Sequence, residues 1–216
     1  HEFRTPLTLI IGPIEKLLKD KSVVGETRNT IEIMNRNAQR LLHLINQIMD
    51  FRKIEKGRME LKVAKGDISA FCKHVFEAFE PLAQTKSIEF AYEENDVPTE
   101  VWFDSQKMEN VLYNLLSNAF KYTPVHGKVK LILTGLKVND SRLSLPSDIS
   151  SSSKRVMSIQ VVDTGIGISQ ENLPLVFKRF YRIESEEAFK ISGSGIGLAL
   201  TEELVKTHHG EIFVKS

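Results

Sequence analysis

The chain has one cysteine in 216 residues, and no apolar run approaches the length that spans a bilayer. Because Cys72 is alone, one chain can form neither a disulfide nor a cysteine-ligated metal cluster, and we expect a reducing compartment. A membrane helix needs about 20 apolar residues, so these residues are expected to make no membrane contact. The start, "HEFRTPL", is charged and contains proline, which does not fit a signal peptide.

The chain also has almost no excess of either charge, since 29 Lys and Arg are balanced by 28 Asp and Glu. The first 58 residues carry 11 basic and 7 acidic side chains, an excess too small to predict nucleic-acid binding. The hydrophobic share of 41% is typical of soluble globular proteins. The length suits one large or two small domains. Because the chain starts without Met and inside a motif, we expect it to be a piece of a longer protein.

Two heptad patterns fill the first part of the chain, at 1–19 and 27–56. Apolar residues there step alternately by three and four positions, which predicts two helices. The segment between them, "KDKSVVGE", is predicted to be a turn. The seam residues are Phe3, Leu7, Ile10, Ile14 and Leu17, followed by Ile31, Met34, Ala38, Leu41, Ile45 and Ile48. Two helices cannot cover such stripes alone, so we expect two copies of the hairpin to form a dimeric four-helix bundle.

From residue 58 onward, strand patterns alternate with helix patterns. Strands are predicted at 59–68, 87–95, 100–104, 128–135, 155–163 and 211–216, and helices at 69–86, 105–123, 172–182 and 197–209. This order predicts an α+β fold in which helices cover a mixed sheet. The first of these helices is predicted to bury Phe71, Val75, Phe76, Phe79 and Leu82. A Ser-rich insert at about 137–155 is predicted to be an exposed loop.

The helix at 105–123 carries a polar stripe opposite its apolar face. Asn114, Asn118, Lys121 and Tyr122 share the stripe by the 3.6-residue period. Asn amide oxygens suit Mg²⁺ when phosphates supply the negative charge, and Lys121 can neutralise a phosphate. Tyr122 can lie against a purine face. Taken alone, the stripe fits a solvated helix face equally well.

The segment "VVDTGIGIS" places a carboxylate at a strand end, directly before glycines. Asp163 can accept a hydrogen bond from the amino group of adenine, while Gly165 and Gly167 let the backbone approach a ligand. A plain strand-end turn is the alternative. An aspartic protease also uses Asp-Thr-Gly, but it needs two such segments in an almost all-β chain, and this chain has one.

A second glycine segment, "GSGIGLAL", opens the last predicted helix. Its backbone N–H groups and the positive end of the helix dipole suit phosphate. It is not a P-loop, because no Gly-Lys-Ser/Thr follows, and no strand precedes it as in a dinucleotide-binding fingerprint. The residues between the glycine segments predict a lid over a nucleotide, anchored by Phe177 and Phe180. An ordinary surface helix and loop is the alternative.

Four segments follow one another in the order of the N, first glycine, F and second glycine boxes of histidine kinases, which they resemble. They are the Asn-rich helix, Asp-x-Gly-x-Gly, Phe-x-x-Phe and Gly-x-Gly-x-Gly. The resemblance implies an α/β-sandwich ATP-binding domain at 58–216, in a superfamily with Hsp90, MutL and type II topoisomerases, with its C-terminal strand cut off. It implies ATP and Mg²⁺ as ligands, with Asn114 and Asn118 on the metal. The implied nucleotide-binding residues are Asn114, Asn118, Lys121, Tyr122, Asp163, Gly165, Gly167, Phe180, Arg182, Gly193, Gly195, Gly197 and Leu198.

The opening "HEFRTPL" resembles the phosphoacceptor box of the kinase dimerisation domain, here residues 1–57 with the upstream turns missing. The resemblance implies that His1 is the nucleophile and Glu2 its base, and that Thr5 assists dephosphorylation of the receiver. Without that context, a histidine at a helix end is usually a surface residue. His208 and His209 lie at a predicted helix C-terminus, where positive charge is favourable, and we interpret them as structural.

The resemblance implies ATP-dependent autophosphorylation of a histidine, followed by transfer to an aspartate of a response-regulator receiver domain. The segment "HEFRTPLTLIIGPIEKLL" is most similar to hybrid kinases, in which that receiver belongs to the same full-length chain. A cytoplasmic location is expected for these residues, and anchoring in the bacterial inner membrane for the full-length protein. The alternatives are a degenerate dimerising nucleotide-binding module without transfer, and an Hsp90-like ATPase whose hydrolysis survives His1→Ala.

Overall fold

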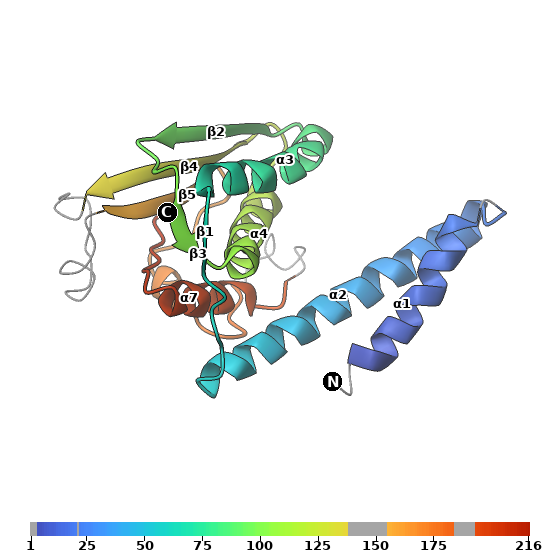
Figure 1. Cartoon of the computed structure of the whole chain (residues 1–216). Helices are drawn as coiled ribbons and strands as arrows, with labels where there is room; N and C mark the ends of the chain where they lie inside the picture. Colours follow the sequence, from blue (N-terminus) through green and yellow to red (C-terminus); the bar gives the residue numbers. More distant parts are fainter. Residues whose placement is uncertain (1–3, 21, 138–154, 184–192) are drawn as a thin grey trace. The chain divides into compact units, whose positions relative to one another are not determined.

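The computed structural model describes residues 4–20, 22–137, 155–183 and 193–216 (Figure 1). The chain divides into two compact units, His1–Met59 and Glu60–Ser216. The predicted His1 and Glu2, most of the Ser-rich insert and part of the predicted lid lie outside the described residues.

The first unit is a helical hairpin of α1 (Arg4–Lys19) and α2 (Gly25–Glu55), which confirms the predicted helical region. In the turn, the Ser22 N–H donates to Asp20 Oδ1 at 2.8 Å. Arg28 Nη1 of α2 donates to the Leu18 carbonyl of α1 at 3.3 Å. Helix α1 buries Leu7, Ile11 and Ile14, so one apolar stripe closes the hairpin.

In the single chain, the predicted heptad residues alternate between covered and exposed positions, which agrees with the expectation that two helices cannot cover these stripes alone. Ile31, Ala38 and Ile45 of α2 are half-buried. The other predicted seam residues are exposed in the single chain, and these are Ile10, Leu17, Met34, Leu41 and Ile48. One antiparallel helix covers only part of an apolar face this wide. The hairpin therefore keeps a second apolar stripe on its surface.

The second unit contains a three-stranded mixed sheet in the order β2-β4-β5. Its strands are β2 (Glu89–Asn95), β4 (Lys128–Lys137) and β5 (Arg155–Asp163). Strand β4 is parallel to β2 and antiparallel to β5. The short strands β1 (Ala64–Gly66) and β3 (Val101–Phe103) form a separate antiparallel pair. The prediction of a mixed sheet is confirmed.

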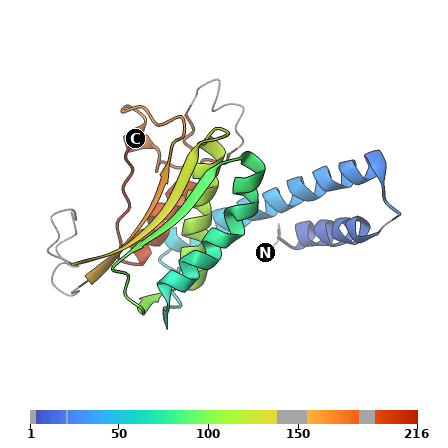
Figure 2. The same ribbon diagram turned by 90° about the horizontal axis from the view of Figure 1, so that it is seen from above.

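Helices α3 (Ile68–Lys86) and α4 (Ser105–Tyr122) cover one face of this sheet (Figure 2). Their contact with β4 forms the core, in which Leu112, Leu116, Leu131 and Leu133 are fully buried. Burial of one such side chain contributes about 1.5–3 kcal/mol. This packing fixes α4, and with it the polar stripe, against the sheet.

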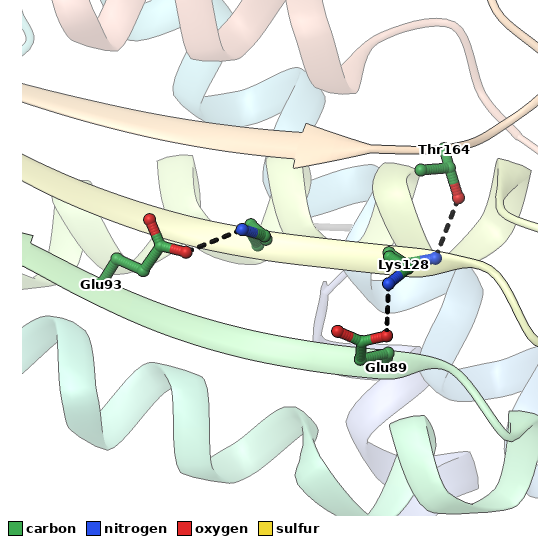
Figure 3. Close-up of polar contacts among 5 residues, drawn as sticks. Glu89, Glu93, Lys128 and Thr164 are labelled. Carbon is green, nitrogen blue, oxygen red and sulfur yellow. Dashed lines mark hydrogen bonds and ion pairs between the residues drawn. The ribbon is translucent and has the colours of Figure 1, made fainter.

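The other face of the sheet carries cross-strand ion pairs (Figure 3). Lys128 Nζ lies 2.7 Å from Glu89 Oε2, and Lys130 Nζ lies 2.7 Å from Glu93 Oε1. Exposed pairs contribute little stability, about 0–1 kcal/mol each, but opposite charges on adjacent strands favour the observed register.

Several predicted elements differ from the structure. Residues 211–216 form no strand, and of the strand predicted at 59–68 only Ala64–Gly66 forms. The helix predicted at 172–182 is a 3-10 turn, Leu173–Leu175, followed by turns. Leu82 was predicted to be buried but is 39% exposed, whereas Ala83 beside it is buried.

A buried carboxylate joins the start of α4 to two other segments. Asp104 caps the helix through the Lys107 N–H at 3.1 Å and also accepts the Lys62 N–H at 2.7 Å. Its own N–H donates to His208 Nε2 at 3.3 Å, and His208 Nδ1 pairs with the Leu204 carbonyl at 2.8 Å. Neutral His208 with its proton on Nδ1 satisfies both bonds, which supports its structural interpretation.

Burial alone would raise the pKa of Asp104, but the two backbone donors and nearby positive charge outweigh it, so the pKa is lowered from 3.8. A carboxylate with a depressed folded-state pKa stabilises the fold above its unfolded pKa. That contribution is lost as the pH falls through the folded pKa.

We predict that Asp104→Ala lowers the free energy of unfolding by about 1–3 kcal/mol at pH 7, because a cap and a second N–H lose their acceptor. Below about pH 4, the difference in unfolding free energy between wild type and the variant should become smaller. Urea unfolding at pH 7 and below pH 4 measures this difference. Asp67, the exposed cap of α3 with one bond to the Ala70 N–H, is the matched control, and Asp67→Ala should cost less. Equal losses for the two variants would contradict this role of Asp104.

Candidate functional site

Two segments of the second unit meet the polar edge of α4. The turn after β5 joins it where the Ile166 N–H donates to the Tyr122 carbonyl at 3.3 Å. Helix α7 (Gly197–Thr207) joins it where Asn114 Nδ2 donates to the Gly197 carbonyl at 3.2 Å. The fold thus brings the two glycine segments, which are distant from α4 in sequence, beside the polar stripe predicted on that helix.

The turn after β5 is held by the neighbouring strand. The Thr164 N–H donates to the Lys128 carbonyl at 3.0 Å, and the Lys128 N–H returns a bond to Thr164 Oγ1 at 2.9 Å (Figure 3). Asp163 Oδ1 accepts the Gly165 N–H at 2.8 Å. The Asp163 carboxylate is exposed and oriented, with one oxygen used by the turn.

Gly165 leaves no room for a side chain. A Cβ there would lie 2.5 Å from Asp163 Oδ1 and 2.8 Å from the Tyr122 carbonyl oxygen. Both distances are far below van der Waals contact, and the second neighbour is backbone. The close approach of the turn to α4 therefore requires glycine.

The residues before α7 lie beside the cation of the polar stripe. A Cβ on Gly193 would be 2.7 Å from Lys121 Nζ. The same amine donates to Tyr122 Oη at 3.2 Å and lies 4.8 Å from the centre of that ring. A positive charge is thus held next to a glycine segment that opens a helix, an arrangement suited to an anion.

The segment predicted as a lid contacts the second glycine segment through its backbone. The Phe180 N–H donates to the Gly195 carbonyl at 2.9 Å. Gly195 has φ +69, and a Cβ there would be 2.7 Å from the Phe180 carbonyl carbon. The Phe180 ring is 69% exposed, so the expected anchoring by its side chain is wrong in this structure. Phe177 is half-buried.

The remaining predicted residues are placed as follows. Asn118 is half-buried one turn after Asn114, Leu198 is half-buried in the first turn of α7, and Gly167 (φ +72) and Arg182 are exposed. Thr5 is exposed on α1 in the other unit. Sequence reasoning missed Thr164 and Thr201. Thr164 lies inside the Asp-Thr-Gly motif, and Thr201 lies one helical turn after Gly197, which was the available signal.

The donor set of α4 fits Mg²⁺ bound with phosphates, because neutral amide oxygens leave the negative charge to the nucleotide. Among the residues that the structure describes, no group of three or more His, Cys, Asp or Glu side chains could hold a metal ion. Asn114 and Asn118 are the amides available at this site.

Comparison with known families follows the division of the chain. Residues 1–57 match the His Kinase A (phospho-acceptor) domain, and residues 103–216 match the histidine kinase-, DNA gyrase B-, and HSP90-like ATPase family. The chain belongs to the histidine kinase family. The histidine kinase resemblance drawn from the sequence motifs is thereby confirmed.

Curated relatives are similar over nearly the whole chain. It is 36% identical over 214 residues to hybrid signal transduction histidine kinase D of Dictyostelium discoideum, covering 99% of this chain and 13% of that protein. It is 30% identical over 217 residues to the autoinducer 2 sensor kinase/phosphatase LuxQ of Vibrio harveyi, covering 100% of this chain and 24% of that protein. The chain thus spans a quarter or less of the length of these two relatives.

A solved structure shares the fold of this histidine kinase chain. The crystal structure of full-length ShkA in complex with AMPPNP matches with a TM-score of 0.72 and 26% identity, over 95% of this chain and 39% of that one. Across the described ranges of this chain, no helix combines the length and apolarity needed to cross a membrane.

We predict that Gly165→Ala weakens nucleotide binding about five- to 150-fold while the fold is retained. The new methyl group must displace the Tyr122 carbonyl or the Asp163 carboxylate, and overpacking of this kind costs about 1–3 kcal/mol, where 1.4 kcal/mol is tenfold. Titration with ADP, with circular dichroism as the folding check, measures it. Gly12→Ala is the control, because a Cβ there has no heavy atom within 4 Å. Unchanged ADP affinity in Gly165→Ala would exclude this turn from the site.

Proposed function

We propose that this chain binds Mg-ATP in its second unit, phosphorylates His1, and transfers the phosphoryl group to an aspartate of a receiver domain. The observation that carries the proposal is the meeting of both glycine segments with the polar edge of α4. A single surface thereby offers a carboxylate for a base, a cation and helix N–H groups for phosphates, and amide oxygens for a metal.

The adenine end lies at the turn after β5. The Gly165 N–H holds one oxygen of Asp163, which orients the carboxylate so that its other oxygen can accept the amino group of adenine. Tyr122 packs on the base, and Gly165 and Gly167 let the backbone approach it.

The phosphate end lies at the start of α7. Lys121 beside Gly193, together with Arg182, neutralises the phosphates, and Gly193, Gly195, Gly197 and Leu198 present backbone N–H groups at the helix N-terminus. Asn114 and Asn118 offer amide oxygens to Mg²⁺, and Phe180 belongs to the segment that closes over the nucleotide. When bound, Mg²⁺ would neutralise charge on the transferring phosphoryl group.

The chemistry proposed for the first unit uses His1, Glu2 and Thr5. A ring nitrogen of His1 attacks the γ-phosphorus of ATP, the N–P bond forms as the bond to ADP breaks, and Glu2 takes the imidazole proton. Thr5, the second residue of α1, assists the separate task of dephosphorylating the receiver. A relative is named a sensor kinase/phosphatase, which supports including this second activity.

The exposed apolar stripe of the hairpin supports homodimerisation. Leu17, Met34, Leu41 and Ile48 are exposed in the single chain, and apolar faces of this kind are covered in four-helix bundles. The relatives include a hybrid kinase and a sensor kinase, which supports a receiver in the same full-length chain and an anchored sensor as further parts of the proposal.

Incubation of the full-length protein with γ-labelled ATP and Mg²⁺ tests this function. The label should be acid-labile and base-stable, as expected for phosphohistidine, and absent from His1→Gln and Asn118→Ala. A receiver domain added to the labelled protein should take up the label. Tight ATP binding without any label would support the degenerate module instead, and steady ATP hydrolysis in His1→Ala would support the Hsp90-like ATPase.

We predict that Leu41→Glu raises the dissociation constant of the dimer at least tenfold. Each subunit would lose a buried leucine worth about 1.5–3 kcal/mol, and 1.4 kcal/mol is tenfold in affinity. Sedimentation equilibrium measures the change. Asn29→Glu, at an exposed polar position of α2, should leave the dimer intact. A dimer equally tight in both variants would place the interface elsewhere.

A further inference from the structure

Thr201 is a hydroxyl residue in a place where helices normally bury apolar side chains. It lies on α7 and is 0% exposed, next in sequence to the buried Leu200. A hydroxyl buried without a partner costs free energy, and the partner here is Asn114 Nδ2 of α4, at 3.3 Å from Thr201 Oγ1. The bond joins α7 to the polar stripe of the nucleotide site.

The neighbours determine which end of the Asn114 amide faces α7. The Gly197 carbonyl, 3.2 Å away, can only accept, so the atom that faces it is the nitrogen. Thr201 Oγ1 takes the second hydrogen of that nitrogen. The two bonds use both N–H groups of the amide and fix its rotation.

The carbonyl oxygen of the amide is oriented as a consequence. A Cβ on Gly197 would lie 3.0 Å from Asn114 Oδ1 and 3.4 Å from its Cγ, so the amide packs closely against the glycine. Rotation by 180° would bring the oxygen against the Gly197 carbonyl, with lone pairs facing each other. Thr201 Oγ1 adds a second acceptor for the Asn114 nitrogen, which further stabilises the observed orientation.

We propose that Thr201 is a positioning residue that holds the Asn114 amide with its oxygen presented to Mg²⁺ on the bound nucleotide. The inference rests on the proposed function, in which Asn114 contributes that oxygen. Thr201 itself touches neither metal nor nucleotide. Its effect should therefore appear only in the metal-dependent part of binding.

Thr201→Val tests this, because valine keeps the shape of threonine and removes the acceptor. Loss of one hydrogen bond is expected to weaken AMPPNP binding about three- to tenfold in the presence of Mg²⁺. Binding of AMPPNP in EDTA should change less than twofold. Thr201→Ser restores the acceptor and should recover most of the Mg²⁺-dependent affinity.

A second comparison separates positioning from general loosening of α7. In an Asn114→Ala background, Thr201→Val should have no further effect on Mg²⁺-dependent binding, because the two residues act through one contact. A Val variant that binds like wild type, or that weakens equally with Mg²⁺ and with EDTA, overturns the inference alone. A wild-type protein that binds AMPPNP in neither buffer overturns the proposed function and this inference with it.

Discussion

The structure of the second unit depends on α4 making two kinds of contact at once. Its apolar face, with Leu112 and Leu116 fully buried, packs on β4. Its polar edge hydrogen-bonds to α7 through Asn114 and to the turn after β5 through the Tyr122 carbonyl. Because the core fixes the rotation of α4, it also fixes where these polar groups point. The site is in this sense a consequence of the core packing.

Backbone contacts complete the arrangement at both glycine segments. Gly165 and Gly197 lie so close to α4 that a Cβ would approach its atoms to 2.8 and 3.0 Å. Glycine at these positions lets the turn and helix α7 approach α4 directly, and Gly193, just before α7, lies beside Lys121 Nζ. One feature of the sequence thus provides both the packing and the anion-binding character of the surface.

Most helices and strands, and the polar edge of α4 in the candidate site, could be predicted from the sequence, because they depend on local patterns. The 3.6-residue period placed Asn114 and Lys121 on one edge of a helix, and glycines marked the segments that approach it. Details set by tertiary partners could not be predicted. Ile10 and Ile11 are equally apolar, yet only Ile11 is buried, because the covering helix is narrower than the stripe. Thr201 was missed because its partner lies 87 residues away.

The most direct test of the account is backbone hydrogen exchange with and without Mg-AMPPNP, since it reads the two glycine segments independently of activity. The account predicts slowed exchange at residues 163–167 and at the start of α7, around 193–198, and little change along β2. Protection confined to other segments, or none at saturating nucleotide, would contradict a nucleotide site formed by α4, the turn after β5 and α7.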